Sequence, residues 1–118
     1  MKTSELKGAA LDWAVAKCEG TPEYLLDKPW RASELLEHYS TDWAQGGPII
    51  EREGISVASD TSGVFEGFVW FASYDSILTD AEDAVGVRGP TPLIAAMRCY
   101  IASKLGDTVE IPNELANG

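Results

Sequence analysis

The sequence predicts an α+β fold in which a small antiparallel sheet packs against an N-terminal and a C-terminal helix. Apolar residues recur at helical spacing over residues 4–19 and 93–105, and they alternate along residues 55–58 and 64–74. A chain of 118 residues can bury its own hydrophobic core without disulfides or a structural metal. We therefore expect one domain over residues 1–118.

The first predicted helix covers residues 4–19. Thr3 or Ser4 is expected to cap its start, and Gly20 follows its end. Apolar residues occupy most of its circumference, so the helix should be largely buried. Trp13 lies in its middle and is expected in the core.

Shorter elements are predicted between this helix and the second strand. Residues 33–38 can form two helical turns, and residues 49–54 look like a short helix that Pro48 starts and Gly54 ends. The two strands carry β-branched and aromatic residues and are joined by a Gly-containing connection, which is typical of an antiparallel pair. Residues 75–88 are predicted to be an acidic loop.

The last long helix is predicted over residues 93–105, opened by the sequence Gly-Pro-Thr-Pro and ended by Gly106. Its apolar surface is so broad that we expect the helix to be buried on nearly all sides. Either the first helix or a second copy of the chain should cover it. Residues 108–112 could add a short terminal strand, and a frayed tail should follow.

Charge and residue counts exclude several functions. Nine basic against nineteen acidic residues give a net charge of −10, which opposes binding to nucleic acids. One histidine and the distant Cys18 and Cys99 have no metal-ligand spacing, so no metal or cofactor is expected. Neither cysteine has a neighbouring base, and no nucleophile motif occurs, which argues against an enzyme. No apolar run is long enough to span a membrane, and we expect a cytoplasmic protein.

Three blocks of the sequence resemble a known family. They are residues 4–16 (SELKGAALDWAVA), residues 40–53 (STDWAQGGPIIERE), and the stretch that begins GPTPLIAAMRCY at residue 89 and continues to Val109. Together they are similar to the NinX-like family of small proteins encoded by tailed phages and prophages. The resemblance implies a phage accessory protein made in the host cytoplasm, in a family without an assigned biochemical activity.

Two glycine- and proline-rich stretches precede predicted helices, where free N–H groups can bind phosphate. Exposed tryptophans could stack on a base, and arginines could neutralise the charge. Arg98 is flanked by apolar residues and must meet an anion, a carbonyl or a carboxylate. Ordinary helix starts, packed aromatics and a structural salt bridge from Arg98 to Asp12, Asp42 or Glu51 are the alternatives. The candidate ligand site comprises Trp43, Gly46, Gly47, Arg52, Trp70, Gly89, Thr91 and Arg98.

The acidic excess is concentrated in residues 49–87, which hold eight acidic residues against Arg52 alone. It is either a solvated face or a surface for a basic partner. The sequence thus supports two functions. The first is host takeover or counter-defence by sequestering a small anionic ligand such as a nucleotide. The second is inhibition of a basic host protein, for which the candidate residues are Glu66, Asp75, Asp80, Glu82 and Asp83.

Overall fold

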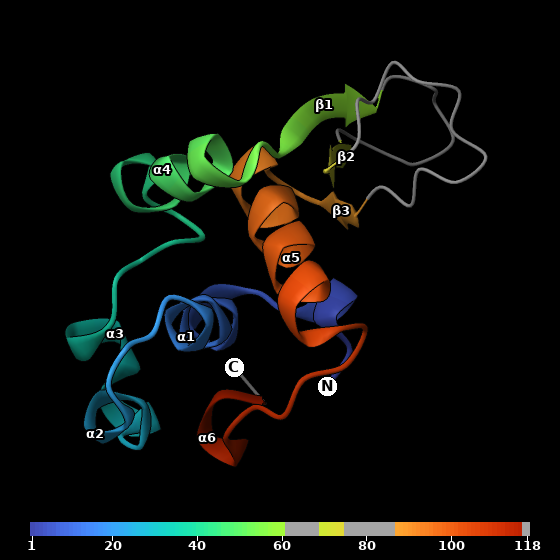
Figure 1. The fold of residues 1–118 in the computed structure, drawn as a ribbon. Helices are drawn as coiled ribbons and strands as arrows, with labels where there is room; N and C mark the ends of the chain where they lie inside the picture. Colours follow the sequence, from blue (N-terminus) through green and yellow to red (C-terminus); the bar gives the residue numbers. More distant parts are fainter. Residues whose placement is uncertain (61–68, 75–86, 117–118) are drawn as a thin grey trace.

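The chain folds into an α+β arrangement centred on one long helix (Figure 1). The computed structural model describes residues 1–60, 69–74 and 87–116. Its long helices are α1 (Gly8–Cys18), α4 (Trp43–Glu53) and α5 (Pro92–Leu105), and its short ones are α2 (Glu23–Leu26), α3 (Ala32–Leu35) and α6 (Asn113–Ala116). The predicted α+β class is confirmed.

The described strands are β1 (Ser56–Asp60), β2 (Val69–Ser73) and β3 (Val87–Gly89), paired antiparallel in that order. The predicted pairing of the first two is confirmed, with Ala58 opposite Phe71. The predicted loop over 75–88 is wrong at its end, because Val87 and Arg88 pair with β2. Such a short strand has too few residues to show an alternating pattern. The remainder of that loop, the start of the predicted second strand and the turn before it lie outside the described residues.

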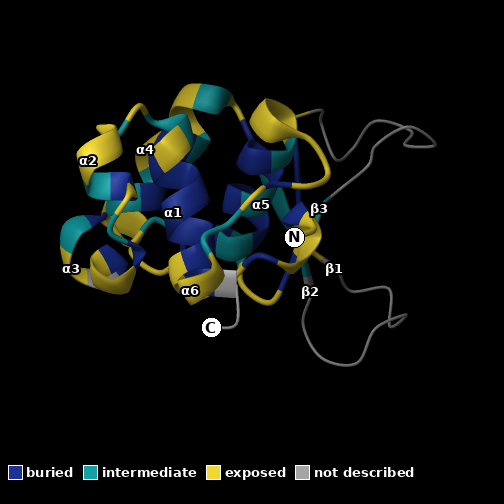
Figure 2. Cartoon of the chain, turned by 90° about the horizontal axis from the view of Figure 1, so that it is seen from below, coloured by how far each residue is buried: buried dark blue, intermediate teal, exposed yellow. Residues whose placement is uncertain are grey.

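Helix α5 contacts all three strands as well as α1 and α4. Its side chains Leu93, Met97 and Ile101 are fully buried, and so are Leu11 and Val15 of α1. Figure 2 shows these two helices as the dark-blue interior of the molecule. The predicted last helix is therefore confirmed, and its apolar surface is covered within one chain. Assembly with a second copy stays a prediction.

The start of the first predicted helix is wrong. A 3-10 turn over Thr3–Glu5 comes first, and α1 begins only at Gly8, whose φ of 56° lies in the left-handed region. The Thr3 hydroxyl does not cap the helix but donates to the Gly106 carbonyl at 2.7 Å. Gly20, with φ 82°, follows the end of the helix as predicted.

The N-terminal segment lies against the chain that follows α5. The Met1 amine donates to the Val109 carbonyl at 3.0 Å, and the Thr3 N–H donates to the Asp107 carbonyl at 2.8 Å. Lys2 and Thr108 form an isolated antiparallel bridge. The predicted terminal strand is therefore reduced to one bridge. The predicted frayed tail is wrong for residues 113–116, which form α6 and bury Leu115, and its last two residues lie outside the described ranges.

Residues 21–42 cover one side of α1 (Figure 1). They form α2, a 3-10 turn over Pro29–Arg31 and α3, so the predicted two-turn helix over 33–38 is shorter and begins one residue earlier. The Trp13 indole N–H donates to the Leu26 carbonyl at 2.9 Å, and Trp13 is 8% exposed. Its predicted place in the core is confirmed. None of the described helices is both long and apolar enough to cross a membrane.

A buried carboxylate also ties this region to α1. Asp12 Oδ1 accepts the backbone N–H of Ser40 at 2.8 Å. Burial raises the pKa of Asp12, and the contacts with Ser40 oppose that rise. A raised pKa means that the folded state binds the proton more tightly than the unfolded chain. This group therefore stabilises the fold at low pH, and its contribution is lost as the pH rises through the raised pKa.

Replacing Asp12 with asparagine should leave the protein at least as stable as wild type at pH 7, because the amide oxygen can still accept the Ser40 N–H. The advantage should shrink toward about pH 4, where the wild-type carboxyl takes up its proton. Asp12→Ala leaves the N–H unpaired and should cost about 1–3 kcal/mol. Urea unfolding at both pH values measures these differences. An asparagine variant as unstable as the alanine variant at pH 7 would contradict the expectation.

Candidate functional site

Gly46 and Gly47 lie inside α4 rather than before it. Asp42 caps the helix, with its Oδ1 accepting the Ala44 N–H at 2.9 Å. The Gly46 N–H donates to the Asp42 carbonyl at 2.9 Å. The predicted helix start at Pro48, with free N–H groups at the two glycines, is therefore wrong. Gly54, with φ 69°, ends the helix as predicted.

Gly89 and Thr91 stand at a helix start of the ordinary kind. A Cβ on Gly89 would lie 2.6 Å from the backbone nitrogen of Ala95, so this glycine lets β3 pack directly on α5. Thr91 caps the helix, with its hydroxyl oxygen accepting the Ile94 N–H at 3.1 Å. The predicted beginning of the last helix is confirmed, but the hydroxyl of Thr91 already occupies its first turn.

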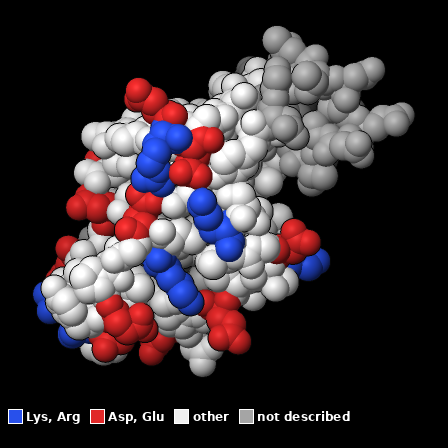
Figure 3. All heavy atoms as spheres, viewed as in Figure 1, with Lys and Arg blue, Asp and Glu red and all other residues white. Residues whose placement is uncertain are grey.

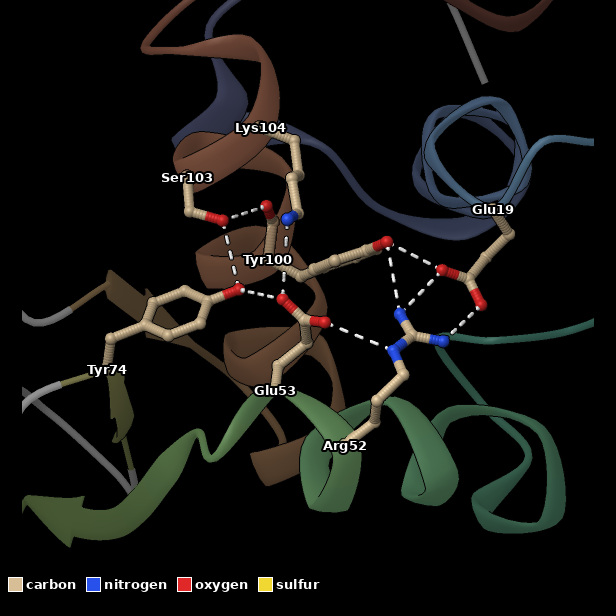
Figure 4. A network of polar contacts seen from close by, with 7 residues as sticks. All are labelled: Glu19, Arg52, Glu53, Tyr74, Tyr100, Ser103 and Lys104. Atoms are coloured by element: carbon tan, nitrogen blue, oxygen red, sulfur yellow. Dashed lines mark hydrogen bonds and ion pairs between the residues drawn. The ribbon is translucent and has the colours of Figure 1, made fainter.

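Arg52 is held by two carboxylates (Figure 4). Its Nη1 and Nη2 donate to the two oxygens of Glu19 at 2.9 and 2.8 Å, and its Nε donates to Glu53 at 3.1 Å. The same bonds lower the pKa of both acids. Such a bidentate contact fixes the plane of the guanidinium. Arg52 therefore joins the ends of α1 and α4 and is already neutralised.

The polar cluster around Arg52 extends onto α5 and β2. The Tyr100 hydroxyl donates to Glu19 at 2.6 Å, and the Tyr74 hydroxyl donates to Glu53 at 3.2 Å. Burial and the bond to Glu19 raise the pKa of Tyr100. Ser103 donates to the Tyr74 oxygen and Lys104 pairs with Glu53, as Figure 4 shows. This cluster cross-links four elements, and its charges are balanced internally.

The two candidate stacking tryptophans lie on different elements. Trp43 is the first residue of α4 and is 54% exposed, whereas Trp70 is half-buried in β2 and pairs with Gly89. The cysteines show no sign of activation, because burial raises the pKa of Cys99 to about 11 and also raises that of Cys18. Among the described residues, no group of three or more potential ligands could hold a metal ion.

Arg98 meets carbonyl oxygens rather than a carboxylate. Its Nε donates to the Leu6 carbonyl at 2.7 Å, and its Nη1 donates to the Arg88 carbonyl at 2.9 Å. No carboxylate in the described ranges lies within ion-pair distance of it, so the predicted salt bridge is wrong. Burial lowers the pKa of Arg98, because a half-buried cation loses hydration. A bound anion would compensate that loss.

A pocket of about 460 Å³ opens beside Arg98. Lys2 and Asp107 also contribute to its wall, and so does the backbone of Arg88, whose carbonyl accepts from Arg98. The guanidinium of Arg88 lies 4.5 Å from the centre of the Phe71 ring. Because Gly89 faces α5, its neighbour Arg88 directs its side chain to the opposite face of the sheet. The complete lining is Lys2, Thr3, Ser4, Val87, Arg88, Arg98, Ala102, Asp107 and Thr108. We refer to this hollow as the Arg98 pocket.

A comparison with protein-family models identifies the chain. The model described as "Bacteriophage P22, NinX" matches residues 2–104. The chain belongs to the NinX family. This confirms the resemblance found in the sequence. No curated protein matches the chain.

The NinX match includes Lys2, Arg88 and Arg98 and ends before Asp107. Of the eight ligand residues predicted from the sequence, only Arg98 lines this pocket. Trp70 and Gly89 are brought together in the sheet, and Trp43 lies on the same helix as Gly46 and Gly47. The other seven candidates do not line this pocket, and their role in binding a ligand stays a prediction.

Sequence reasoning missed Lys2 and Arg88. Lys2 reaches the pocket because the N-terminus pairs with residues 107–109, and no local pattern indicates so distant a contact. Arg88 could have been singled out from the sequence, because it is the first basic residue after the acidic middle segment. On the face shown in Figure 3, acidic and basic side chains are interspersed. The five acidic partner-binding candidates, Glu66, Asp75, Asp80, Glu82 and Asp83, lie outside the described residues.

Proposed function

We propose that this NinX-family protein binds a small anionic ligand in the Arg98 pocket and acts by sequestration rather than catalysis. One observation carries the proposal. The half-buried guanidinium of Arg98 and Lys2, from opposite ends of the sequence, line one pocket, although the chain as a whole has a net charge of −10. An isolated basic pocket on an acidic protein concentrates small anions while the remaining surface repels long polyanions such as DNA.

The state of Arg98 supports this proposal. Its bonds to the Leu6 and Arg88 carbonyls orient the guanidinium without neutralising it. Its Nη2 group has no hydrogen bond to any residue in the described ranges. A phosphate oxygen accepting from this edge would form a charge-assisted hydrogen bond at a site that is already positioned.

The size of the pocket favours a nucleotide-sized ligand. Small-molecule sites usually have volumes of about 300–1,000 Å³, and the Arg98 pocket falls within that range. A phage protein that removes a nucleotide signal from the host cytoplasm would serve host takeover or counter-defence. The role of the acidic segment in binding a basic host protein stays a separate prediction.

Calorimetric titration with inorganic phosphate and with linear and cyclic nucleotides tests the proposal. We expect at least one nucleotide to bind, and the Lys2→Glu variant to bind it about tenfold or more weakly, because one attraction becomes a repulsion. The backbone bridge of Lys2 to Thr108 does not need its side chain. Binding should also weaken as salt is added.

Lys28→Glu provides the matched control. Lys28 lies just before the 3-10 turn at Pro29, at the opposite end of the molecule from β3 (Figure 1), and the change in total charge is the same. This variant should retain nearly all of the affinity. Absence of binding by every anion, or equal weakening by the two variants, would refute a ligand site at the Arg98 pocket.

A further inference from the structure

The Arg98 pocket contains one positive charge that the fold leaves uncompensated. Two of the three guanidinium nitrogens of Arg98 donate to the carbonyls of Leu6 and Arg88, which carry no net charge. Arg88 takes part in this contact through its backbone, because its own guanidinium lies over the Phe71 ring on the other face of the sheet. The Nη2 group of Arg98 is therefore the point at which an anion can bind.

The other two charged side chains of the pocket have opposite signs. Lys2 and Asp107 are both exposed and both line the pocket. Neither forms an ion pair with any residue in the described ranges, so both charges act on whatever occupies the pocket. The C-terminal end of α5, between Ala102 and Asp107, adds a partial negative charge on this side. The pocket as a whole therefore offers a single net positive charge, that of Arg98.

The remainder of the wall is small and uncharged. Val87 and Ala102 are apolar, and the Thr3 hydroxyl already donates to the Gly106 carbonyl. A ligand with one anionic group and an uncharged body fits such a wall. A second negative charge would have no cation of its own and would lie near Asp107, and a half-buried charge without a partner is costly.

From this balance of charges we infer that the ligand is a nucleotide whose phosphate is a diester, as in a cyclic nucleotide, rather than a terminal phosphate. The inference rests on the anion-binding function proposed above and adds the ligand class. A phosphodiester carries one negative charge, whereas a terminal phosphate carries nearly two above pH 7. One oxygen of the diester accepts from the Nη2 group of Arg98, and the nucleoside lies against Val87 and Ala102.

Calorimetry at pH 8 with three adenine nucleotides tests the ligand class. The probes are cyclic adenosine monophosphate, the methyl ester of adenosine monophosphate, and adenosine monophosphate itself. The first two are diesters with one negative charge, and the third has nearly two. On the wild-type protein we expect both diesters to bind about tenfold more tightly than adenosine monophosphate. The methyl ester has no phosphate ring, so it separates the effect of charge from that of shape.

A short adenine oligonucleotide distinguishes a free nucleotide from a nucleic-acid strand, which contains the same diester groups. The chain has a net charge of −10, which repels the repeated charges of a strand. We expect the oligonucleotide to bind about tenfold or more weakly than the cyclic nucleotide. Tighter binding of the oligonucleotide would overturn the assignment to a free nucleotide.

The Asp107→Asn variant should reduce the preference for diesters. It removes a negative charge from the pocket at nearly constant size, and the bond from Thr3 is retained because it uses the backbone of residue 107. Since Coulomb energy is proportional to the charge of the ligand, a dianion gains twice as much free energy as a monoanion. We expect the diesters to bind about threefold more tightly and adenosine monophosphate about tenfold more tightly than on the wild-type protein.

Glu110→Gln is the matched control, because it changes the total charge equally while Glu110 is exposed and does not line the pocket. It should preserve the preference for the diesters. If wild type binds adenosine monophosphate as tightly as the diesters, if the methyl ester binds as weakly as adenosine monophosphate, or if Asp107→Asn tightens all three ligands alike, the ligand class is wrong while anion binding stands. If none of these probes binds and no other anion does, the proposed function itself fails, and the inferred ligand fails with it.

Discussion

Gly46→Ala should lower the free energy of unfolding by about 2–3 kcal/mol, as expected when a well-packed interior is overfilled. The added Cβ would collide with the backbone carbonyl of Tyr39 and would lie 2.6 Å from Cδ1 of Leu93. Leu93 is itself buried at the first turn of α5, so neither neighbour can move freely. This glycine allows α4 to approach both the preceding chain and α5.

Gly47→Ala should have the opposite effect. Its Cβ would meet only Cε3 of Trp43, at an ordinary contact distance of 3.8 Å. Alanine in a helix is more stable than glycine by about 0.5–1 kcal/mol, because glycine loses more backbone entropy on folding. The two variants add the same atoms at adjacent positions of one helix, so each is the control for the other.

Urea denaturation of the two variants, followed by circular dichroism, measures both changes in stability. Destabilisation at Gly46 together with stabilisation at Gly47 is the expected result. If the two glycines instead formed an anion-binding loop, both substitutions would weaken ligand binding and their effects on stability would be similar. If Gly47→Ala still binds nucleotides as wild type does, the two glycines serve helix packing and not ligand binding.

Local patterns predicted the elements whose physical causes are local. The apolar surface and Gly106 were enough to place α5, and alternation was enough to pair β1 with β2. The beginning of α4 was misjudged because proline is most often found in the first turn of a helix. Here the Asp42 cap starts the helix six residues before Pro48, and Pro48 has no N–H to donate to the Ala44 carbonyl. The cap, and not the proline, determines where this helix begins.

The candidate site was harder to predict because long-range contacts build it. The apolar surroundings of Arg98 correctly marked it as a cation in need of partners. Its partners are the carbonyls of Leu6 and Arg88, however, and any residue type can supply a backbone carbonyl. The pairing of Lys2 with Thr108 completes the pocket, and it depends on how the two ends of the chain meet. No spacing or motif in the sequence predicts such long-range contacts.

Trp13→Ala should produce the largest loss of stability, about 3–5 kcal/mol, which is typical of truncating a buried aromatic side chain. Trp13 belongs to the buried face of α1, and its indole N–H reaches the Leu26 carbonyl at the end of α2. Truncation would leave a cavity and remove the donor for that carbonyl. The packing of α2 on α1 should weaken together with the core.

Trp13→Phe separates these two contributions. Phenylalanine restores most of the apolar contact but leaves the Leu26 carbonyl without its donor, so the loss should be about 1–3 kcal/mol. Trp30→Ala is the control, because Trp30 is 68% exposed, and its loss should change stability by no more than about 0.5 kcal/mol. Urea unfolding of the three variants ranks the effects. If Trp13→Ala were no more destabilising than Trp30→Ala, the indole would not be what holds residues 21–42 on the core, and Asp12 would be the principal link between α1 and that segment.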